Sequence, residues 1–575
     1  MGLQWDLIGI ITLAGILMFH CFAHSEKAPY YTFVKDANSA PEIAYYDYII
    51  IGGGTAGCPL AATLSQGARV LVLERGGSPY DNPNITNMEN FATTLADMSP
   101  RSPAQQFISQ DGVFNVRARV LGGGSVLNAG FYTRADTGYV KEAGWNETLV
   151  NQSYEWVEKV VTFKPPLMEW QSAVRDGLLE VGVLPNNGFT YDHVSGTKVG
   201  GTIFDTEGHR HTAADLLQYA DPTRITVYLH ATVQKISFNY NNGTARTRAN
   251  GVIFKDVFGV EHRARLNKNS KNEIILSAGA IGSPQLLMLS GIGPSEQLEA
   301  HGIKVMVDQP LVGRGMADNP MNAIFVPSPR PVELSLIQVV GVTKFGSYIE
   351  AASGLGFGYS WAQRLPRDPG LAVNQTDQPF MGSPEAMSEA AKTINAAAST
   401  PLRGGVVLEK VTGPLSRGHL ELRTTDPNDN PAVTFNYFEE PEDLKRCVEG
   451  MNTIIDVIKS NAFLEFRYPT MSVRALLTVM LNVPVNLRRR HARAAISLEQ
   501  YCIDTVMTIW HYHGGCHVGT VVDHDYKVIG VDALRVIDGS TFSGSPGTNP
   551  QATVMMLGRY MGEKILRESY SRRRK

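Results

Sequence analysis

The sequence predicts an α/β fold in which buried parallel strands alternate with helices. Three observations carry this prediction: a glycine-rich turn between two apolar strands near the N-terminus, further strand–turn–helix blocks later in the chain, and a length of 575 residues. A chain of this length is too long to fold around one simple hydrophobic core, so we expect two or more structural units. Hydrophobic and charged residues make up 43% and 19% of the chain, which is typical of a globular protein.

The N-terminus carries an apolar run from Leu7 to Phe19, followed by small residues. Its length suits a secretory signal peptide better than a transmembrane helix, which needs about 20 apolar residues. We predict a signal peptide over residues 1–25 and a secreted protein of the cell wall or secretory pathway without a stable membrane span. An uncleaved anchor is the alternative, because no positive segment precedes the run. Five sequons are candidate glycosylation sites: Asn84, Asn146, Asn151, Asn242 and Asn374.

Net charge and cysteine content indicate which partners and which disulfide bonds to expect. The net charge of −3 argues against a nucleic-acid partner, which requires a strongly basic surface. Outside the leader, the cysteines are Cys58, Cys447, Cys502 and Cys516. One disulfide suits an oxidising compartment, and we predict that Cys447 and Cys502 form it. Cys58 lies in an apolar helix pattern, which predicts a buried and inert thiol.

The first strand–turn–helix unit begins at residue 48. The segment "YIII" (48–51) predicts a buried strand, "GGGTAG" (52–57) a tight turn, and "CPLAATLS" (58–65) a helix. A second buried strand, "RVLVLE" (69–74), ends in Glu74.

The turn satisfies the dinucleotide-binding pattern G-x-G-x-x-G through Gly52, Gly54 and Gly57. The first glycine allows the turn, the second lets the backbone approach a pyrophosphate, and the third lets helix and strand pack closely. The phosphate then lies at the positive N-terminus of the helix. Glu74, 22 residues after Gly52, is placed to accept hydrogen bonds from a ribose hydroxyl. The unit indicates a bound dinucleotide, and NAD and FAD both fit it.

Three later blocks contain further turns and strand–helix units. Residues 117–135, "RARVLGGGSVLNAGFYTRA", form a second glycine-rich loop that suits another close backbone approach. Residues 272–293 predict a strand, a Ser-Ala-Gly turn and a helix ended by glycine. Residues 533–542 predict a strand ending in Asp538-Gly539, and residues 548–566 predict a loop entering an amphipathic helix.

Together and in this order, the four blocks resemble the glucose–methanol–choline (GMC) family of FAD oxidoreductases, from about Tyr46 to Leu566. Within it, the chain is most similar to the plant branch of HOTHEAD-like proteins and mandelonitrile lyases. The resemblance implies one FAD, a doubly wound Rossmann-type domain built from discontinuous segments, and an α+β substrate domain whose sheet covers the flavin. The expected segments are FAD-binding 46–145, 205–320 and 501–568, and substrate-binding 146–204 and 321–500.

Carried over residue by residue, the resemblance also implies a set of FAD-binding residues. The loop from Gly52 to Gly57 meets the pyrophosphate, Glu74 and Arg75 lie near the ribose, and Val233 meets the adenine edge. The full expected set is Gly52, Gly54, Thr55, Ala56, Gly57, Glu74, Arg75, Val120, Ser125, Asn128, Ala129, Gly130, Phe131, Val233, Trp510, Asp538, Gly539, Pro550 and Gln551.

The stretch "WHYHGGCHVG" (510–519) is rich in histidine and has two interpretations. It matches a metal site poorly, because a Gly-Gly pair interrupts the ligands and the sequence has no second Cys/His cluster nearby. In the family pattern H-x-x-G, a histidine faces the reactive nitrogen of the flavin. His511 fits that position, and Asn549 lies 38 residues later as its partner. We expect these two residues to be the catalytic pair, no metal, and structural roles for His513 and His517.

Oxidation of an alcohol requires such a pair. A neutral imidazole takes the hydroxyl proton while hydride leaves the carbon, and an amide donates a hydrogen bond to the developing alkoxide. The branch resemblance implies oxidation of a long-chain ω-hydroxy fatty acid toward a dicarboxylic acid, by a monomer that acts on a small-molecule alcohol.

Two other functions stay open. A mandelonitrile lyase has the same fold, but that group carries His where this chain has Asn549, and a cysteine in the middle of the chain. A non-catalytic, flavin-stabilised cell-surface protein would be free to lose His511 or Asn549. The substrate part offers one more candidate, the basic segment "NLRRRHAR" (486–493), interpreted as a solvated helix face, with binding of a substrate carboxylate as the alternative.

Overall fold

The computed structural model describes residues 29–80, 82–239, 247–354 and 403–571. The chain divides into two units, Met1–Thr32 and Phe33–Lys575, and every element below belongs to the second. The predicted signal peptide and the sequons at Asn242 and Asn374 lie outside the described residues.

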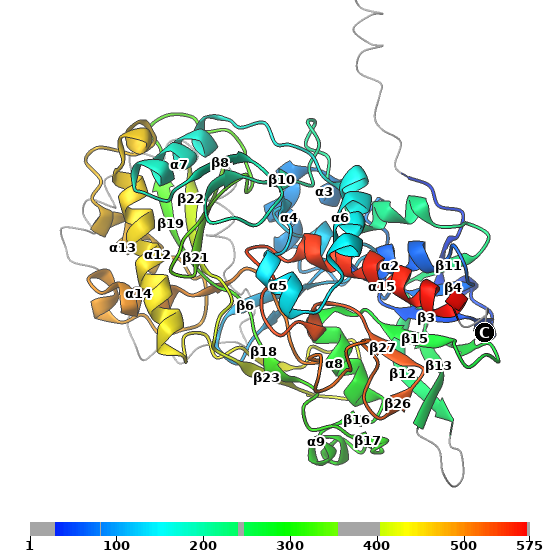
Figure 1. Ribbon diagram of the computed structural model, residues 1–575. Helices are drawn as coiled ribbons and strands as arrows, with labels where there is room; N and C mark the ends of the chain where they lie inside the picture. The colour runs from blue at the N-terminus through cyan, green and yellow to red at the C-terminus, as the bar shows by residue number, and fades with distance from the viewer. Residues whose placement is uncertain (1–28, 81, 240–246, 355–402, 572–575) are drawn as a thin grey trace, which may run out of the picture. The chain divides into compact units, whose positions relative to one another are not determined.

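A six-stranded parallel sheet carries the predicted dinucleotide unit (Figure 1). Its two predicted strands are adjacent, with Tyr48 beside Val70 and Ile51 beside Leu73. Both strands are buried along their whole length, which explains their uninterrupted apolar sequences. In spatial order the strands are β1 (Val34–Asp36), β11 (Ile225–Leu229), β4 (Val70–Leu73), β3 (Tyr48–Ile51), β15 (Glu273–Leu276) and β27 (Leu534–Val536). The predicted α/β fold is therefore confirmed.

Helices and a second sheet cover this parallel sheet. The predicted helix after the glycine turn is α2 (Gly57–Leu64), and it packs against the C-terminal helix α15 (Gln551–Ser571) (Figure 1). Close approach of the two helices is possible because α15 presents Gly558 and Gly562 to α2. A Cβ atom on Gly558 would lie 2.2 Å from the Ala56 carbonyl oxygen, and one on Gly562 would lie 2.7 Å from Thr63. The second sheet has the order β12 (Thr232–Asn239), β13 (Thr247–Lys255), β14 (Glu261–Leu266) and β2 (Ile43–Tyr46).

A seven-stranded sheet forms the predicted substrate part. Helices α7 (Glu169–Glu180) and α12 (Pro441–Lys459) pack against its central strands. Its order is β25 (Met507–Thr508), β19 (Pro320–Pro327), β22 (Gly404–Val411), β21 (Ser347–Ser353), β20 (Val339–Val342), β9 (Gly196–Val199) and β8 (Asn186–Phe189).

The division into FAD and substrate segments stays a prediction. Strand β25 belongs to the predicted FAD segment 501–568 and yet pairs with β19 of the substrate sheet. Helix α6 (Glu147–Val161), from the predicted substrate segment 146–204, packs against α15, and its Tyr154 hydroxyl lies 3.0 Å from Thr553 Oγ1. The two parts are thus interleaved along the chain.

Shorter elements connect these layers. Helix α8 (Gly279–Leu289) follows β15 as predicted, and the Gly291 that follows it has a positive φ of 85°. The others are α3 (Pro83–Thr86), α4 (Phe91–Ala96), α5 (Thr137–Glu142), α9 (Ser295–Ala300), α13 (Val473–Leu481), α14 (Leu498–Thr505), β5 (Ala104–Ile108), β6 (Phe114–Ala118), β7 (Phe131–Tyr132), β10 (Gly201–Thr202), β16 (Ile292–Gly293), β17 (Val307–Asp308), β18 (Arg314–Met316), β23 (Gly418–Glu421), β24 (Ala432–Thr434) and β26 (Val531–Asp532).

The interpretation of residues 486–493 as a solvated helix face is wrong. No α-helix forms there, and two of its arginines bind the surrounding backbone instead. Arg488 donates from Nε to the Asp111 carbonyl oxygen (3.0 Å), and Arg490 donates from Nη1 to the Arg488 carbonyl oxygen (2.9 Å) and Asn486 Oδ1 (2.7 Å). The guanidinium groups satisfy carbonyl groups that an irregular loop leaves without partners.

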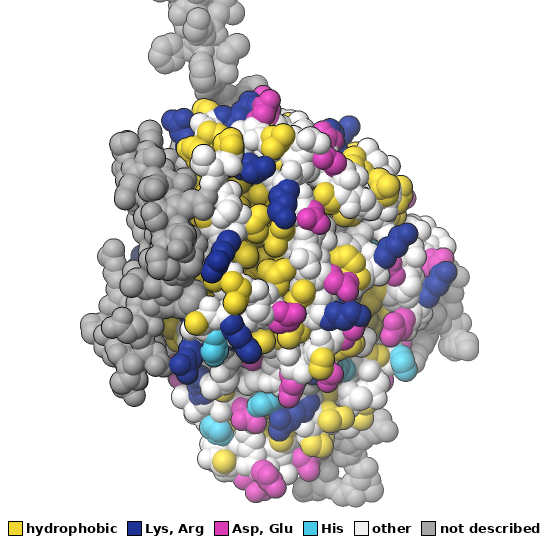
Figure 2. Space-filling view, turned by 90° about the vertical axis from the view of Figure 1, so that its left-hand side faces the viewer, with side chains coloured by type: hydrophobic (Ala, Val, Ile, Leu, Met, Phe, Trp, Pro, Cys, Tyr) yellow, Lys and Arg dark blue, Asp and Glu magenta, His cyan; other side chains and the backbone are white. Residues whose placement is uncertain are grey.

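On the face drawn in Figure 2, the described residues form no extended patch of one charge. Basic and acidic side chains alternate there, with apolar side chains gathered between them (Figure 2). Among the described helices, none has the length and apolar character needed to cross a membrane. The sequon asparagines Asn84, Asn146 and Asn151 are exposed, and their glycosylation stays a prediction.

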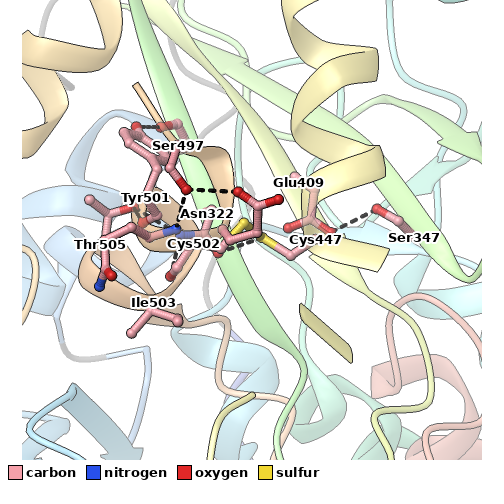
Figure 3. The surroundings of a disulfide bond; sticks show 12 residues. Asn322, Ser347, Glu409, Cys447, Ser497, Tyr501, Cys502, Ile503 and Thr505 are labelled. Atoms are coloured by element: carbon pink, nitrogen blue, oxygen red, sulfur yellow. Dashed lines mark hydrogen bonds between the residues drawn. A yellow bond between two sulfur atoms is a disulfide. The ribbon is translucent and has the colours of Figure 1, made fainter. Parts of the chain in front are cut away.

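The predicted disulfide is confirmed, and it joins α12 to α14 through Cys447 and Cys502 (Figure 3). Both cysteines are fully buried. Asn322 of β19 lies beside the bond and donates from Nδ2 to the Cys502 carbonyl oxygen (3.0 Å) and to Thr505 Oγ1 (2.9 Å). The bond therefore fixes α14, the helix that leads into the histidine-rich stretch.

We expect the variant Cys447→Ala/Cys502→Ala to unfold more easily, by about 2–4 kcal/mol, because the bond closes a long loop in the unfolded chain. Denaturant unfolding measures the difference. Dithiothreitol should bring the wild type to the stability of the variant and leave the variant unchanged, because Cys58 and Cys516 are free and buried. Equal unfolding of variant and wild type without reductant would contradict the prediction.

Candidate active site

A cavity of about 310 Å³ lies where the parallel sheet meets the seven-stranded sheet. Its wall includes Glu74, Ser277 and Asp538, which follow β4, β15 and β27, and Lys410 of β22. Open α/β sheets bind ligands at these carboxyl ends of parallel strands. All predicted site residues except Gly57 line the wall: Gly52, Gly54, Thr55, Ala56, Glu74, Arg75, Val120, Ser125, Asn128, Ala129, Gly130, Phe131, Val233, Trp510, His511, Asp538, Gly539, Asn549, Pro550 and Gln551.

The three glycines of the first turn have different reasons to be glycine. Gly52 has a φ of 102°, in the left-handed region. A Cβ atom on Gly57 would lie 2.0 Å from the Gly52 carbonyl oxygen, so Gly57 serves the packing of α2. At Gly54 the nearest atoms to a Cβ would be Gly123 Cα and the Ser277 carbonyl oxygen, both at 3.8 Å. The protein has room for a side chain at Gly54, so bare backbone there fits a ligand that lies against it.

Glu74 ties the turn to the end of β4. Its carboxylate accepts hydrogen bonds from the backbone N–H groups of Gly53 (3.0 Å) and Gly76 (2.8 Å). Burial raises the pKa of Glu74, and these two donors oppose the rise. The carboxylate thus lies at the cavity wall in a fixed orientation.

Asp538 fixes the opposite side of the wall. Its carboxylate accepts from the Gly279 N–H (2.9 Å), Ser283 Oγ (2.5 Å) and the Ser540 N–H (2.8 Å). The residue therefore joins the end of β27 to the start of α8.

Gln551 joins the start of α15 to the second glycine-rich loop. It donates from Nε2 to the Phe131 carbonyl oxygen (2.6 Å) and accepts from Asn128 Nδ2 (2.8 Å). Three predicted cofactor residues from distant parts of the chain thus form one network.

The backbone of His511 is held by the buried carboxylate of Asp318, just before β19. Asp318 accepts from the His511 N–H (2.8 Å), Thr508 Oγ1 (2.6 Å) and the Tyr437 hydroxyl (2.6 Å). Burial raises the pKa of Asp318 to about 7 despite these donors. Trp510 has a φ of 62°, a left-handed conformation that costs a non-glycine residue about 1–2 kcal/mol. Such strain is typical of functional loops.

The His511 ring lies in the wall beside two groups of the seven-stranded sheet. Its Nδ1 is 3.3 Å from the Tyr348 hydroxyl. Burial lowers the pKa of His511 well below 6.5, and the positive charge of Lys410 adds to this effect. The imidazole is therefore neutral at physiological pH, as a base for a hydroxyl proton must be.

His513 and His517 belong to the same loop and lie outside the cavity wall. His513 Nδ1 is 2.9 Å from the His511 carbonyl oxygen, and its Nε2 is 3.1 Å from Arg417 Nη1. Arg417 has only donors, so Nε2 accepts and Nδ1 carries the proton. Within the described ranges, no group of His, Cys, Asp and Glu is arranged to hold a metal ion.

Asn549 lines the cavity on the loop before α15. Its Oδ1 and the indole Nε1 of Trp510 are buried without a hydrogen-bond partner among the described residues. Buried polar groups normally have partners, so both atoms fit a bound ligand.

Sequence reasoning missed Asp318, Tyr348 and Lys410. Lys410 is fully buried and forms an ion pair with Glu350 of β21. The signal for Lys410 was a pair of charged residues inside an apolar strand, "GGVVLEKV" (404–411). No motif marks Asp318 or Tyr348, whose roles depend on what lies opposite them.

Comparison with known proteins agrees with this geometry. The sequence pattern of the GMC oxidoreductase family matches residues 46–321 and 414–558. Protein HOTHEAD of Arabidopsis thaliana is 53% identical over 95% of this chain and 94% of its own length. An (R)-mandelonitrile lyase-like protein of the same plant is 48% identical over 93% of this chain and 92% of its own.

A formate oxidase of Aspergillus oryzae has a similar structure, with a TM-score of 0.71 over 92% of this chain and all of that chain. At 19% sequence identity, this similarity establishes the fold alone. The family match and the identity to the plant relatives go further: the chain belongs to the GMC family of FAD-dependent oxidoreductases.

Proposed function

We propose that the chain oxidises an alcohol to a carbonyl compound, with His511 as the base and Asn549 as a hydrogen-bond donor to the substrate oxygen. The observation that carries the proposal is a neutral, buried imidazole that shares the cavity wall with the side-chain amide of Asn549, whose Nδ2 can donate a hydrogen bond. A proton acceptor and a hydrogen-bond donor are the two groups that removal of a hydroxyl proton requires.

The predicted cofactor residues fit FAD, and we propose that they hold it. Gly54 leaves bare backbone for the pyrophosphate, and Glu74 presents its carboxylate to the ribose. Asp538 and Gln551 hold the loops on the opposite side of the cavity. When bound, FAD supplies the acceptor for the hydride that leaves the alcohol carbon.

Residues of the chain then accept the hydroxyl proton and orient the substrate. His511 takes the hydroxyl proton, and its low pKa keeps the ring unprotonated beforehand. The Asn549 amide donates to the oxygen as negative charge develops there. The His511 N–H donates to Asp318, and the His511 carbonyl oxygen accepts from His513 Nδ1. These two hydrogen bonds fix the position of the base, which is the main contribution of a preorganised site.

For the substrate, we propose a long-chain ω-hydroxy fatty acid, oxidised toward the oxo and dicarboxylic acids. The similarity to the HOTHEAD branch supports this substrate, and so do Ile337 and Ile509, which give the cavity wall apolar surface. Secretion and a monomeric state belong to the same proposal.

The second candidate is a mandelonitrile lyase, which the identity to the lyase-like relative favours. Two observations favour the oxidation. Asn549 occupies the position where those lyases carry histidine, and the cavity wall contains no cysteine among the described residues. The third candidate, a non-catalytic surface protein, would leave the buried base without a use.

We expect Gly54→Ala to fold normally and to lose FAD, because the added methyl group meets no protein atom closer than 3.8 Å and would occupy the space of the pyrophosphate. Flavin absorbance per protein and the circular dichroism spectrum measure both properties. Gly544→Ala is the matched control, because a Cβ atom there meets nothing within 4 Å. Full FAD content in Gly54→Ala would contradict the proposed cradle.

We expect an ω-hydroxy fatty acid to bleach the flavin absorbance at about 450 nm under anaerobic conditions. His511→Ala should slow bleaching by about 10²–10⁴-fold, the usual contribution of a general base, while FAD stays bound. His524→Ala, at an exposed histidine, is the control. An unchanged spectrum together with release of benzaldehyde from mandelonitrile would establish the lyase instead. No response to either compound would favour the non-catalytic protein.

We expect protonation of His511 to cause no loss in the rate of flavin reduction between pH 8 and 5.5. The active form of His511 is the neutral one, which persists down to its lowered pKa, whereas an imidazole with a pKa of about 6.5 would lose about ten-fold in rate by pH 5.5. Stopped-flow reduction measures the profile. A step near pH 7 that disappears in Asp318→Asn belongs to that carboxyl group. A step near 6.5 that persists in Asp318→Asn would contradict the prediction.

A further inference from the structure

Tyr348 lies where the two loops of the proposed catalytic pair meet. Its position follows from the alternation of side chains along β21 and β22. Tyr348 is directly opposite Lys410, so both point to the same face of the sheet, and Lys410 lines the cavity. The neighbouring Ser347 and Glu409 point to the other face, toward the disulfide, where Ser347 Oγ donates to Glu409 Oε1 (2.8 Å) (Figure 3).

The hydroxyl of Tyr348 also lies beside the side chain of Asn319, and the chemistry of two further neighbours decides the direction of their hydrogen bonds with it. The Thr548 carbonyl oxygen lies 2.9 Å away and can only accept, so it takes the single hydroxyl proton. The second neighbour is His511 Nδ1, at 3.3 Å. The hydroxyl has only lone pairs left for it, so Nδ1 must be the donor. In a neutral imidazole with the proton on Nδ1, the free lone pair is on Nε2.

We propose that Tyr348 is a positioning residue that fixes His511 in the tautomer with the proton on Nδ1, so that Nε2 is the atom that takes the substrate proton. The use of Nε2 as a base rests on the proposed function. The assignment of the tautomer rests on the hydrogen bonds alone.

The surroundings keep this arrangement in place. The backbone of His511 is anchored by Asp318 and His513, which leaves the ring torsions and the tautomer as the remaining freedom. Tyr348 is fully buried in the middle of the sheet, and burial raises its pKa well above 10, so its hydroxyl keeps the proton that it donates. Lys410 lies 5.5 Å from the centre of the Tyr348 ring and disfavours a second proton on His511.

The same hydroxyl also connects the two members of the catalytic pair. Thr548 directly precedes Asn549, so the bond to its carbonyl oxygen fixes the backbone from which the amide projects. One buried hydroxyl thus sets the tautomer of the base and the separation of the base from its partner.

The direct test is ¹⁵N NMR of FAD-bound protein labelled at histidine, with the His511 signals assigned by their loss in His511→Asn. We expect a protonated Nδ1 and an unprotonated Nε2 in the wild type. In Tyr348→Phe both tautomers should be populated, because Nδ1–H loses its acceptor. Tyr501→Phe is the matched control: it also removes one buried tyrosine hydroxyl, which donates to the Ala323 carbonyl oxygen (2.7 Å), and it should leave the His511 signals unchanged.

Kinetics provide the second measurement. With an alcohol substrate, Tyr348→Phe should lower kcat by about ten-fold with KM unchanged, as expected for loss of one buried hydrogen bond. A wild type with the proton on Nε2, or a tautomer that does not respond to Tyr348→Phe, would overturn the proposal. If Tyr348→Phe fails to fold, the wild-type spectrum alone decides. If the tautomer is as expected and no alcohol is oxidised, the proposed function fails and the role of Tyr348 stands.

Discussion

The carboxylate of Asp318 joins its own segment to two others, so that three segments far apart in the sequence meet, one of them containing both Thr508 and His511. It accepts from Tyr437 in one loop, Thr508 in β25 and the N–H of His511 in the next loop. A buried carboxylate without donors costs several kcal/mol, so the three segments must meet for Asp318 to be buried at all. Conversely, loss of the carboxylate would leave three buried donors unpaired, at about 1–3 kcal/mol each. The position of His511 depends on this interaction, because no regular element holds the loop itself.

Strand β22 separates two sets of buried charges. Glu409 points toward the disulfide and the helix α12, and burial raises its pKa well above the usual range. Lys410, the next residue, points to the cavity and pairs with Glu350. A shift of one residue in strand register would place an acidic group beside His511 and raise the pKa of the ring. The register of this strand therefore adds to the effect of burial, which is the main reason that the base stays unprotonated.

The site is assembled from loops, yet most of its groups have a fixed orientation. Gln551 links α15 to Asn128 and Phe131, Asp538 links β27 to α8, and Tyr348 links the loops of His511 and Thr548. Each link is a buried hydrogen bond between segments distant in sequence. Asn549 Oδ1 and Trp510 Nε1, in two residues of the cavity wall, are buried without a hydrogen-bond partner among the described residues. Rigid support around a few unsatisfied groups is the arrangement that binding and catalysis require.

The sequence by itself determined the local units. The G-x-G-x-x-G turn, its two buried strands and helix α2 follow from glycine geometry and apolar runs, which depend on neighbouring residues only. The pairing of Cys447 with Cys502 was also predictable, because few alternatives existed. The choice of His511 over His513 came from its spacing to Asn549, and the structure puts His511 in the cavity wall and His513 outside it.

Tertiary structure alone decided the groups that tune the base. Asp318, Tyr348 and Lys410 lie between about 100 and 190 residues before His511 and match no local pattern. The prediction for segment 486–493 was wrong for the same reason. Its run of arginines predicts a solvated face, but Arg488 and Arg490 donate to carbonyl groups outside the segment, those of Asp111 and Leu481. Hydrogen bonds and charges act through space, so sequence spacing does not encode their partners.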